Sequence, residues 1–457
     1  MMYTPSPLPT APYLRIMVVM PHPWKGGFFR VAAKLCNELL HHDYYGQRFQ
    51  VFLGVPAEYE IPERHILDDK VVAVQLAYES VNLKDERFLS SGLQQHIHAL
   101  DGCTIITPSK SVTTGDSIVL DTVDAFIMLS TLYAGGVFTT EKPYSVFAAD
   151  FIQRYVPEIY TTEDQGYNNH GWELDRNQRI AMKNASCVFA TTPQTLEDVR
   201  SYAGIDEHKT LLFPMFAVDV DAMAPSSMQS QEHDRTILDH LSGREFKIGA
   251  EPYFLWVTNA SAHKNHRNAF QSLRHFYENL GGKTKCIICG PVTDNLKPGF
   301  STHPYHLSIY KILDEWPDFE EHVRIATYID DLAYSHLLRK AQFLWHNVIQ
   351  DNGTFSIIEA SLVGTPILTS SYPQLDFIME KFAIEAQTFS PFDVIGAAVA
   401  LKEMEQSAAN NQNRRQNSGN SKERADTKAR VERENALLGG ALNMLLDKMF
   451  SPTRVNQ

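Results

Sequence analysis

The sequence predicts an α/β fold in two halves, because short apolar runs of the kind that form buried parallel strands alternate with amphipathic helical segments. The first half opens with an apolar run at 14–20, a glycine turn, a helical segment at 28–40 and a second apolar run at 49–55. The second half begins the same alternation at residue 252. A chain of 457 residues, 44% apolar and 21% charged, has the size and composition of a globular protein of two or three domains.

Charge and cysteine usage exclude several classes of function. A formal net charge of −13 without a long basic run argues against a general nucleic-acid binder. Five scattered cysteines favour reduced thiols in a cytoplasmic protein. The CxxC spacing of Cys286 and Cys289 lies inside an apolar run, so we expect a buried strand there and no zinc site. The run at 14–20 is short and contains Arg15, so we expect neither a signal peptide nor a membrane span.

The first half places two candidate site residues after predicted strands. Gly27 belongs to a paired-glycine turn after the run at 14–20, where the backbone can approach a ligand closely. This pair does not match the dinucleotide fingerprint GxGxxG. Asp150 follows the apolar run at 144–149 directly. It either faces an acceptor hydroxyl or serves as a helix N-cap or turn acid, and the residues leave both interpretations open.

The division of the chain is predicted from shifts in composition. Residues 219–221 read Asp-Val-Asp, the spacing of a metal-binding carboxylate pair, but they fall in a connecting segment and we assign no metal to them. We expect a flexible N-terminal tail at 1–13, a first domain at 14–222, a linker at 223–248, a second domain at 249–405, a mobile polar segment at 406–426 and a C-terminal helix at 427–450.

The second half opens with a strand at 252–258, a loop at 259–266 and a helix at 268–280. Lys264 lies in that loop just before the helix, where an ammonium can neutralise a diphosphate. A lysine on a loop is more often only solvated, so Lys264 needs support from other residues. Tyr328 follows a later predicted strand at 323–326 and is a further candidate by position.

Residues 343–372 read as strand, polar turn, helix and strand. The helix is expected over 354–363, with Gly364 and Pro366 placed where a helix should stop. At 100° per residue Glu359 falls within the apolar stripe of this helix. A carboxylate on an inward face needs a partner, which is either a ligand or a nearby Lys or Arg.

Asp351 precedes Glu359 by eight residues, on the loop that leaves the strand. In an open α/β sheet, ligands bind outside the carboxyl ends of strands, where helix N-termini offer free amides. We therefore expect Asp351 and the amides of Gly353, Thr354 and Phe355 to line a crevice, with Glu359 deeper. Amides for charged or hydroxylated groups and carboxylates for sugar hydroxyls suit a nucleotide sugar.

The lysine loop and the acid-x7-acid loop and helix resemble the retaining two-Rossmann (GT-B) glycosyltransferases, the family 4-like group of glycogen-synthase-like enzymes and bacterial mannosyltransferases. The resemblance is strongest over 253–401. It implies two Rossmann-like doubly wound domains facing across a cleft. It also implies transfer of a hexose, with retention, from a GDP- or UDP-sugar to a saccharide or lipid-linked saccharide in polysaccharide biosynthesis. Neither metal nor cofactor is implied, and a lipid-linked acceptor would bring the protein to the inner face of the membrane as a peripheral protein.

By the same resemblance Glu359 binds the donor ribose, Asp351 the transferred sugar and Lys264 the diphosphate. The donor set is then Gly27, Asn259, Lys264, Tyr328, Asp351, Gly353, Thr354, Phe355 and Glu359, and the catalytic set is Lys264, Asp351 and Asp150.

Three positions depart from the family pattern. Asp351 replaces a glutamate of the family, and Asn259 replaces an arginine of the family. The histidine that the family has on the acceptor side is absent near Asp150. These departures leave two alternatives open, a non-catalytic binding or scaffold protein of the same fold and a sugar-nucleotide epimerase. Retention of Lys264, Asp351 and Glu359 favours the transferase.

Overall fold

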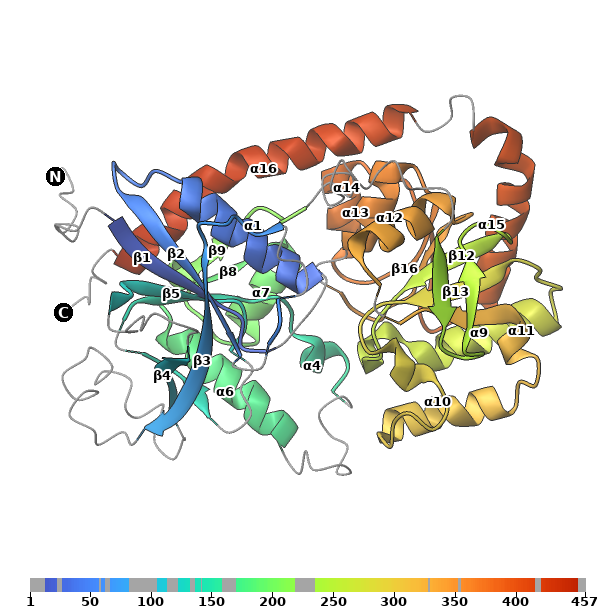
Figure 1. Ribbon diagram of the computed structural model, residues 1–457, viewed down its shortest axis with the longest axis horizontal. Coiled ribbons are helices and arrows are strands. Elements are labelled where there is room, and N and C mark those ends of the chain that lie inside the picture. The colour runs from blue at the N-terminus through green and yellow to red at the C-terminus, as the bar shows by residue number, and fades with distance from the viewer. Residues whose placement is uncertain are drawn as a thin grey trace. The chain divides into compact units, whose positions relative to one another are not determined.

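The computed structural model describes residues 13–22, 27–56, 59–61, 66–81, 105–112, 122–131, 136–140, 142–157, 170–217, 235–327, 329–351, 355–415 and 421–450. The chain divides into two compact units (Figure 1). The first unit comprises Met1–Phe151, Asn169–Phe216 and Asn435–Gln457, and the second comprises Ile152–Asn168 and Ala217–Glu434. Each unit contains a sheet flanked by helices, which confirms the predicted α/β class with two doubly wound units.

The sheet of the first unit has strand order β6-β4-β3-β2-β1-β5-β7-β8-β9 among the described residues. Its neighbouring strands are parallel except for β3 with β4. The strands are β1 (Tyr13–Val19), β2 (Arg48–Pro56), β3 (Val72–Val81), β4 (Ile105–Val112), β5 (Ala125–Met128), β6 (Val137–Phe138), β7 (Tyr144–Phe147), β8 (Cys187–Ala190) and β9 (Thr210–Leu212).

The core of the first unit explains why β1 lies in the middle of its sheet. Met17 and Val19 of β1 are fully buried, as expected for a strand covered on both faces. They join one apolar cluster with residues of β2, β5, β7 and β8. The helices of this unit include α1 (Gly27–His41), α6 (His170–Asn184) and α7 (Pro193–Ser201). Thr192 caps α7 by accepting a hydrogen bond from the Thr195 backbone amide.

The sheet of the second unit has the order β14-β13-β12-β15-β16-β17, with parallel neighbours throughout. In chain order this is 3-2-1-4-5-6, the doubly wound arrangement in which the strand order reverses between the first and fourth strands. The reversal falls between β12 and β15. The strands are β12 (Tyr253–Val257), β13 (Lys285–Cys289), β14 (Val323–Ile325), β15 (Leu344–His346), β16 (Ile367–Ser370) and β17 (Gln387–Phe389).

Aromatic side chains fill the core of the second unit. The rings of Phe254 and Phe343 stack with centroids 4.9 Å apart, and those of Trp256 and Trp345 lie 4.8 Å apart. The helices are α4 (Ile152–Tyr155), α9 (His266–Glu278), α10 (Pro304–Asp314), α11 (Phe319–His322), α12 (Asp331–Lys340), α13 (Phe355–Val363), α14 (Leu375–Phe382) and α15 (Val394–Arg415). Helices α9, α10 and α15 cover one face of this sheet, and α12 and α13 cover the other (Figure 1).

The predicted stop of α13 is confirmed. The helix ends at Val363, and Gly364 follows with a φ of 76°, the left-handed conformation expected of a C′ glycine. The sequence predicts that only one stripe of α13 is buried, but residues 357–362 are all buried. The helix is covered on most of its circumference, and Glu359 is buried among apolar neighbours.

Two segments contain more regular structure than the sequence predicts. Within the expected linker, β10 (Thr236–Asp239) and β11 (Arg244–Lys247) form an antiparallel hairpin. Asp239 ties this hairpin to the second unit, because its Oδ1 accepts a hydrogen bond from the Ile325 amide at 3.1 Å. The expected mobile segment at 406–426 is largely helical, since α15 runs on to Arg415 and α16 (Ser421–Phe450) begins at Ser421. Its Ala, Gln, Glu and Arg residues are good helix formers. The prediction of a mobile segment considered only the polarity of these residues and neglected their helix propensity.

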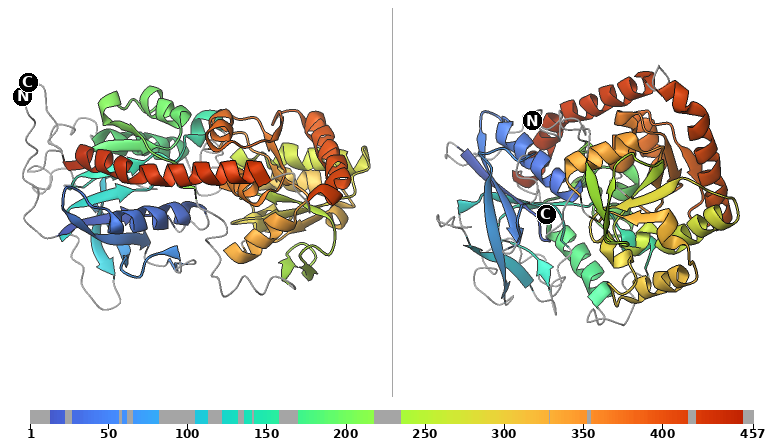
Figure 2. Two further views of the ribbon diagram at one scale, coloured as in Figure 1. Left: turned by 90° about the horizontal axis from the view of Figure 1, so that it is seen from above. Right: turned by 45° about the vertical axis from the view of Figure 1, so that its right-hand side comes forward.

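Helix α16 is shared by the two units, and Figure 2 shows it as one continuous helix. Its first part belongs to the second unit, where Glu434 pairs with Lys381 at 2.9 Å. Its last part belongs to the first unit, where Asn443 contacts His42 at 2.9 Å and Asp447 accepts from the Tyr44 hydroxyl at 2.9 Å. Buried apolar side chains support this second docking, and they are Leu438, Leu442, Leu445, Leu446 and Met449.

We expect Gly290→Ala to lower the free energy of unfolding by roughly 3 kcal/mol or more. Gly290 follows β13 with a φ of 140°, and an added Cβ would lie 1.8 Å from the Thr258 carbonyl oxygen. Urea unfolding measures the change. Gly440→Ala is the matched control, because this α16 glycine faces open space and the change should stabilise by about 1 kcal/mol. Equal effects of the two substitutions would contradict the close approach of these strand ends.

Candidate functional site

The candidate site lies where the strand order of the second unit reverses. Strands β12 and β15 are parallel neighbours, with Leu255 in register with Leu344. Their carboxyl ends therefore meet at one edge of the sheet, and the loop after β12 contains Lys264 while the loop after β15 contains Asp351. Such a switch point is the usual ligand crevice of an open α/β sheet.

Lys264 ends a short 3₁₀ turn, Ala262–Lys264, directly before α9. Asn265 follows in the left-handed conformation with a φ of 58°, which asparagine tolerates better than most residues. Its side-chain amide donates to the Pro391 carbonyl at 2.6 Å and to Asn347 at 3.3 Å. The loop is also tied to the loop after β15, because the Ile349 amide donates to the His263 carbonyl at 2.8 Å. The backbone that bears Lys264 is thus fixed at both ends of the turn.

Lys264 and Asp351 form a direct ion pair between these two loops. Their side chains are only 13% and 17% exposed, so the pair is largely shielded from water. Burial alone would raise the pKa of Asp351, but the Lys264 ammonium and the His346 ring outweigh it and hold that pKa well below 3.8. His346 Nε2 lies 3.7 Å from the same carboxylate oxygen. Asp351 is therefore ionised at neutral pH.

Three buried histidines surround the ion pair or adjoin it, and all are held neutral. Burial, reinforced by the Lys264 charge, lowers the pKa of His263 to about 3. Burial also lowers the pKa of His346, and it lowers the pKa of His266 well below 6.5. His263 contacts the Ser261 hydroxyl at 2.9 Å and His346 contacts the Thr369 hydroxyl at 2.9 Å. The charge of the region is therefore concentrated on Lys264 and the carboxylates.

Glu359 is 4% exposed and lies on the middle of α13. Its Oε2 accepts a hydrogen bond from the Tyr334 hydroxyl at 2.6 Å, and Tyr334 is 7% exposed. The sequence predicts either a ligand or a cationic residue as the partner of this acid. The Tyr334 phenol is one partner of this acid, and the sequence does not predict this contact.

Backbone strain is concentrated on the same edge of the sheet. Asn265, Val292 and Thr327 have φ values of 58°, 53° and 47°, and they lie in the loops after β12, β13 and β14. The left-handed conformation is costly for β-branched residues such as valine and threonine. Strained residues of this kind cluster at functional sites, where surrounding contacts hold them.

The other predicted site residues fall in different places. Asn259 has a local role in the loop, where its Oδ1 accepts from the Ser261 amide at 3.0 Å. Phe355 is the first residue of α13. Gly27, the first residue of α1, and Asp150, after β7, lie at the carboxyl edge of the first unit's sheet. Tyr328, Gly353 and Thr354 lie outside the described residues.

Three residues that contact the predicted site residues or hold their loops were not predicted from the sequence. Tyr334 carries no motif, and its only signal is a position on the helix that follows β14. His346 ends an apolar strand and is more often a core residue in that setting. Asn265 could have been suspected, because asparagine directly before a predicted helix is a frequent left-handed or capping residue.

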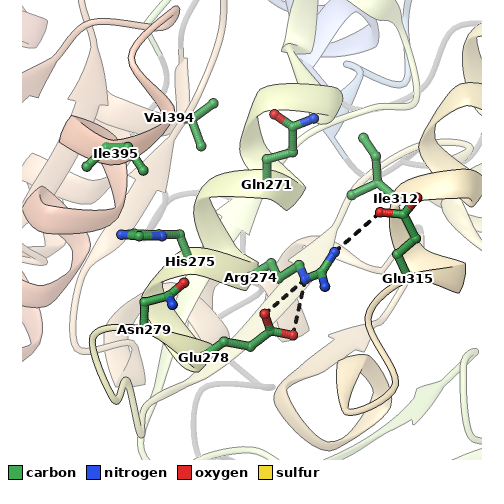
Figure 3. Close-up of a pocket in the computed structure, with 9 residues that line it drawn as sticks. All are labelled: Gln271, Arg274, His275, Glu278, Asn279, Ile312, Glu315, Val394 and Ile395. Carbon is green, nitrogen blue, oxygen red and sulfur yellow. Dashed lines mark hydrogen bonds and ion pairs between the residues drawn. The ribbon is translucent and has the colours of Figure 1, made fainter.

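A separate hollow of about 400 Å³ lies between α9, α10 and the start of α15. Figure 3 shows Arg274 at its centre, hydrogen-bonded to Glu278 and to Glu315. This guanidinium is neutralised by its own acidic neighbours. Neither Lys264 nor the predicted carboxylates line the hollow, so we do not identify it with the candidate site.

The described residues contain neither a metal-binding cluster nor a helix able to cross a membrane. Among the residues that the structure describes, His, Cys, Asp and Glu side chains form no group of three or more arranged to hold a metal ion. Over the same residues, every helix falls short of the length or the apolar character that crossing a membrane requires.

The structure is similar to several solved structures over nearly its whole length. It matches sucrose-phosphate synthase from Thermosynechococcus elongatus with a TM-score of 0.59 at 13% identity, covering 95% of this chain and 99% of that chain. HepE from Anabaena, in complex with UDP and glucose, gives a TM-score of 0.54 at 12% identity over 95% and 100%. A UDP-forming trehalose-phosphate synthase from Burkholderia xenovorans gives 0.54 at 12% identity over 95% and 98%.

By sequence, no family model and no curated protein matches the chain. At such low identity the structural likeness establishes the fold alone. The chain has the GT-B fold, and the predicted resemblance is confirmed at that level.

We expect Lys264→Met to lower the free energy of unfolding by about 3 kcal/mol, because it leaves the shielded Asp351 carboxylate without its cation. The double variant Lys264→Met, Asp351→Asn should lose clearly less than the sum of the single changes, since the two residues are coupled. Urea unfolding at pH 7 measures all three. Arg274→Met is the control, because its pair with Glu278 is more exposed and should contribute under about 1 kcal/mol. Additive effects at Lys264 and Asp351 would show that the pair does not form.

Acid should destabilise the protein as the pH falls from 6.5 towards 4.5. In this range an unfolded histidine takes up a proton, while folded His263, with a pKa of about 3, does not. The unfolded chain therefore binds more protons, and one such group lowers stability by up to about 1.4 kcal/mol per pH unit. Urea unfolding at several pH values should show a smaller slope for His263→Asn. An unchanged slope would mean that His263 is protonated in the folded protein.

Proposed function

We propose that the protein is a retaining hexosyltransferase that uses a GDP- or UDP-sugar and a hydroxyl acceptor on a saccharide or lipid-linked saccharide. A role in polysaccharide biosynthesis follows from the same proposal. The observation that carries it is the shielded Lys264–Asp351 ion pair at the carboxyl ends of β12 and β15. A cation and an anion held at a switch point suit a ligand with both phosphates and sugar hydroxyls.

The donor diphosphate is assigned to Lys264 and the adjoining N-terminus of α9. Both provide positive potential, the first as an ammonium and the second through the helix dipole and backbone amides of its first turn. A bound diphosphate would take over the ammonium that now contacts Asp351. The Asp351 carboxylate would then be available to accept hydrogen bonds from hydroxyls of the transferred sugar.

The remainder of the donor is assigned to α13 and the loop before it. Glu359, on the middle of α13, would accept hydrogen bonds from the ribose, and the amide of Phe355 at the start of the helix would lie beside the sugar or phosphates. Gly353 and Thr354, which precede this helix, are proposed to bind the donor, as is Tyr328. Asn259 and Gly27 are also proposed as donor-binding residues.

The proposed reaction breaks the bond between the anomeric carbon and the diphosphate oxygen. The acceptor oxygen forms a new bond to that carbon on the same face, which retains the anomeric configuration. The departing diphosphate oxygen takes the acceptor proton, and Lys264 with the α9 amides stabilises its developing charge. Asp150 is the acceptor-side candidate. The scheme requires no metal ion.

The structural comparisons support the donor class. The HepE structure contains UDP and glucose, and the Burkholderia enzyme forms UDP. Their folds match that of this chain over nearly its whole length, which makes a nucleotide sugar the natural first probe.

We expect a nucleoside diphosphate or its hexose conjugate to stabilise the protein against thermal unfolding. UDP, GDP and ADP series are compared, and a ligand at ~100 times its dissociation constant adds about 2.7 kcal/mol. The stabilisation should disappear in Glu359→Ala and persist in Gly440→Ala.

With an active donor, Lys264→Met should reduce turnover by ~10²-fold or more while remaining folded.

The product identifies the reaction. Nuclear magnetic resonance of the product anomer distinguishes retention from inversion, and an altered sugar nucleotide formed without acceptor would identify an epimerase instead. Binding without turnover for any acceptor tested would favour the non-catalytic alternative. The absence of stabilisation by all three nucleotide series would overturn the proposal.

A further inference from the structure

Tyr334 is the donor of a short buried hydrogen bond to the Glu359 carboxylate, 2.6 Å from Oε2. We propose that Tyr334 is a positioning residue that orients Glu359 for the ribose hydroxyls of a nucleotide donor. This inference rests on the proposed function and adds to it a residue outside the lysine loop and the acid-x7-acid segment. Tyr334 touches the carboxylate and acts on the ligand through it.

The backbone of Tyr334 is held by contacts that do not involve the helix bearing Glu359. It lies on the first turn of α12, where Asp330 caps the helix by accepting from the Ala333 amide at 2.7 Å. The Tyr334 amide donates to the Asp330 carbonyl at 2.9 Å. Arg235 contacts the Asp330 carboxylate at 3.3 Å and connects this cap to the β10–β11 hairpin region. The phenol hydroxyl is thus presented from a fixed backbone.

Helix α13 is fixed from its other side. The Ser361 hydroxyl contacts the Thr427 hydroxyl of α16 at 2.7 Å, and both residues are buried. The Thr365 hydroxyl donates to the Leu338 carbonyl at the end of α12, at 2.7 Å. With both helices fixed, the Tyr334 hydrogen bond restricts the rotation of the Glu359 carboxyl group. A glutamate side chain has three rotatable bonds, so this contact removes freedom that a ligand would otherwise have to remove.

The chemistry of a phenol suits this role better than that of a cation. A lysine or arginine at this place would neutralise the carboxylate and compete with neutral sugar hydroxyls for it. A phenol donates one hydrogen bond without adding a charge of its own, so an ionised Glu359 would keep its negative charge and bind hydroxyl donors more strongly than a neutral acceptor would. The adjacent hydroxyls of a ribose are donors of this kind.

The test compares UDP with 2′,3′-dideoxy-UDP by isothermal titration calorimetry, with GDP and its dideoxy form used if the guanine series is the one that binds. Wild-type protein should prefer UDP by ~10-fold or more, because a site that hydrogen-bonds a hydroxyl rejects the analogue that lacks it. Tyr334→Phe should weaken UDP by ~10-fold and leave dideoxy-UDP within about twofold, so that the preference largely disappears.

Two further variants separate positioning from stability. Tyr253→Phe is the matched control, since Tyr253 is also buried and its hydroxyl donates to the Leu337 carbonyl at 2.7 Å. It should leave the preference for UDP unchanged even where it lowers the unfolding temperature. In a Glu359→Gln background, Tyr334→Phe should change the UDP affinity by less than about twofold, because the two residues act as a unit.

Equal weakening of UDP and dideoxy-UDP in Tyr334→Phe would overturn the inference in favour of a purely structural role. An unchanged preference in that variant would overturn it as well. A wild-type protein that binds UDP, but no more tightly than dideoxy-UDP, would remove the ribose role of Glu359 while leaving the proposed transfer intact. Failure of every nucleotide to bind wild-type protein would instead overturn the proposed function itself.

Discussion

The ion pair of Lys264 and Asp351 is the interaction on which the rest of the candidate site depends. It joins the loops that follow β12 and β15, the two strands between which the sheet changes direction. Neither charge would be stable alone in this shielded position, because desolvation of an unpaired charge is costly. The backbone around it is held accordingly, with Asn265 in a left-handed conformation and bonded to both neighbouring loops. The charges of Lys264 and Asp351 therefore neutralise each other.

The residues around this pair strengthen the electrostatic interactions of its two charges. His263 and His346 are buried and uncharged, so they fill space and donate or accept hydrogen bonds without adding charge at neutral pH. The two side chains are largely shielded from solvent, and electrostatic interactions between shielded charges are stronger than in water. A phosphate that displaces Asp351 from Lys264 would meet an ammonium already oriented and partly dehydrated. Under the proposed function, this arrangement would stabilise the charge that develops on the departing diphosphate.

The sequence predicted the parts of this molecule that depend on local order along the chain. Strand runs, the glycine stop of α13 and the positions of Lys264 and Asp351 after strands could all be read from residue types and spacing. The contact of Tyr334 with Glu359 could not, because two residues on different helices meet only through packing. The β10–β11 hairpin was also missed, since its strands are short and are held by contacts with residues distant in the sequence, such as that of Asp239 with the Ile325 amide. The length of α15 was underestimated, because its last residues have high helix propensity but low sequence complexity. The first property favours a helix and the second favours a mobile segment.

Helix α16 has a consequence for the order in which the protein is made. The first unit comprises Met1–Phe151 and Asn169–Phe216, and it is completed only by Asn435–Gln457. Leu442, Leu445 and Leu446 are buried within that unit, and His42 and Tyr44 find their partners on the same helix. During synthesis on the ribosome, the amino-terminal sheet would leave the exit tunnel long before this helix exists. The contacts of α16 with His42 and Tyr44 can form only after almost the entire second unit has been translated, so these contacts of the first unit form late.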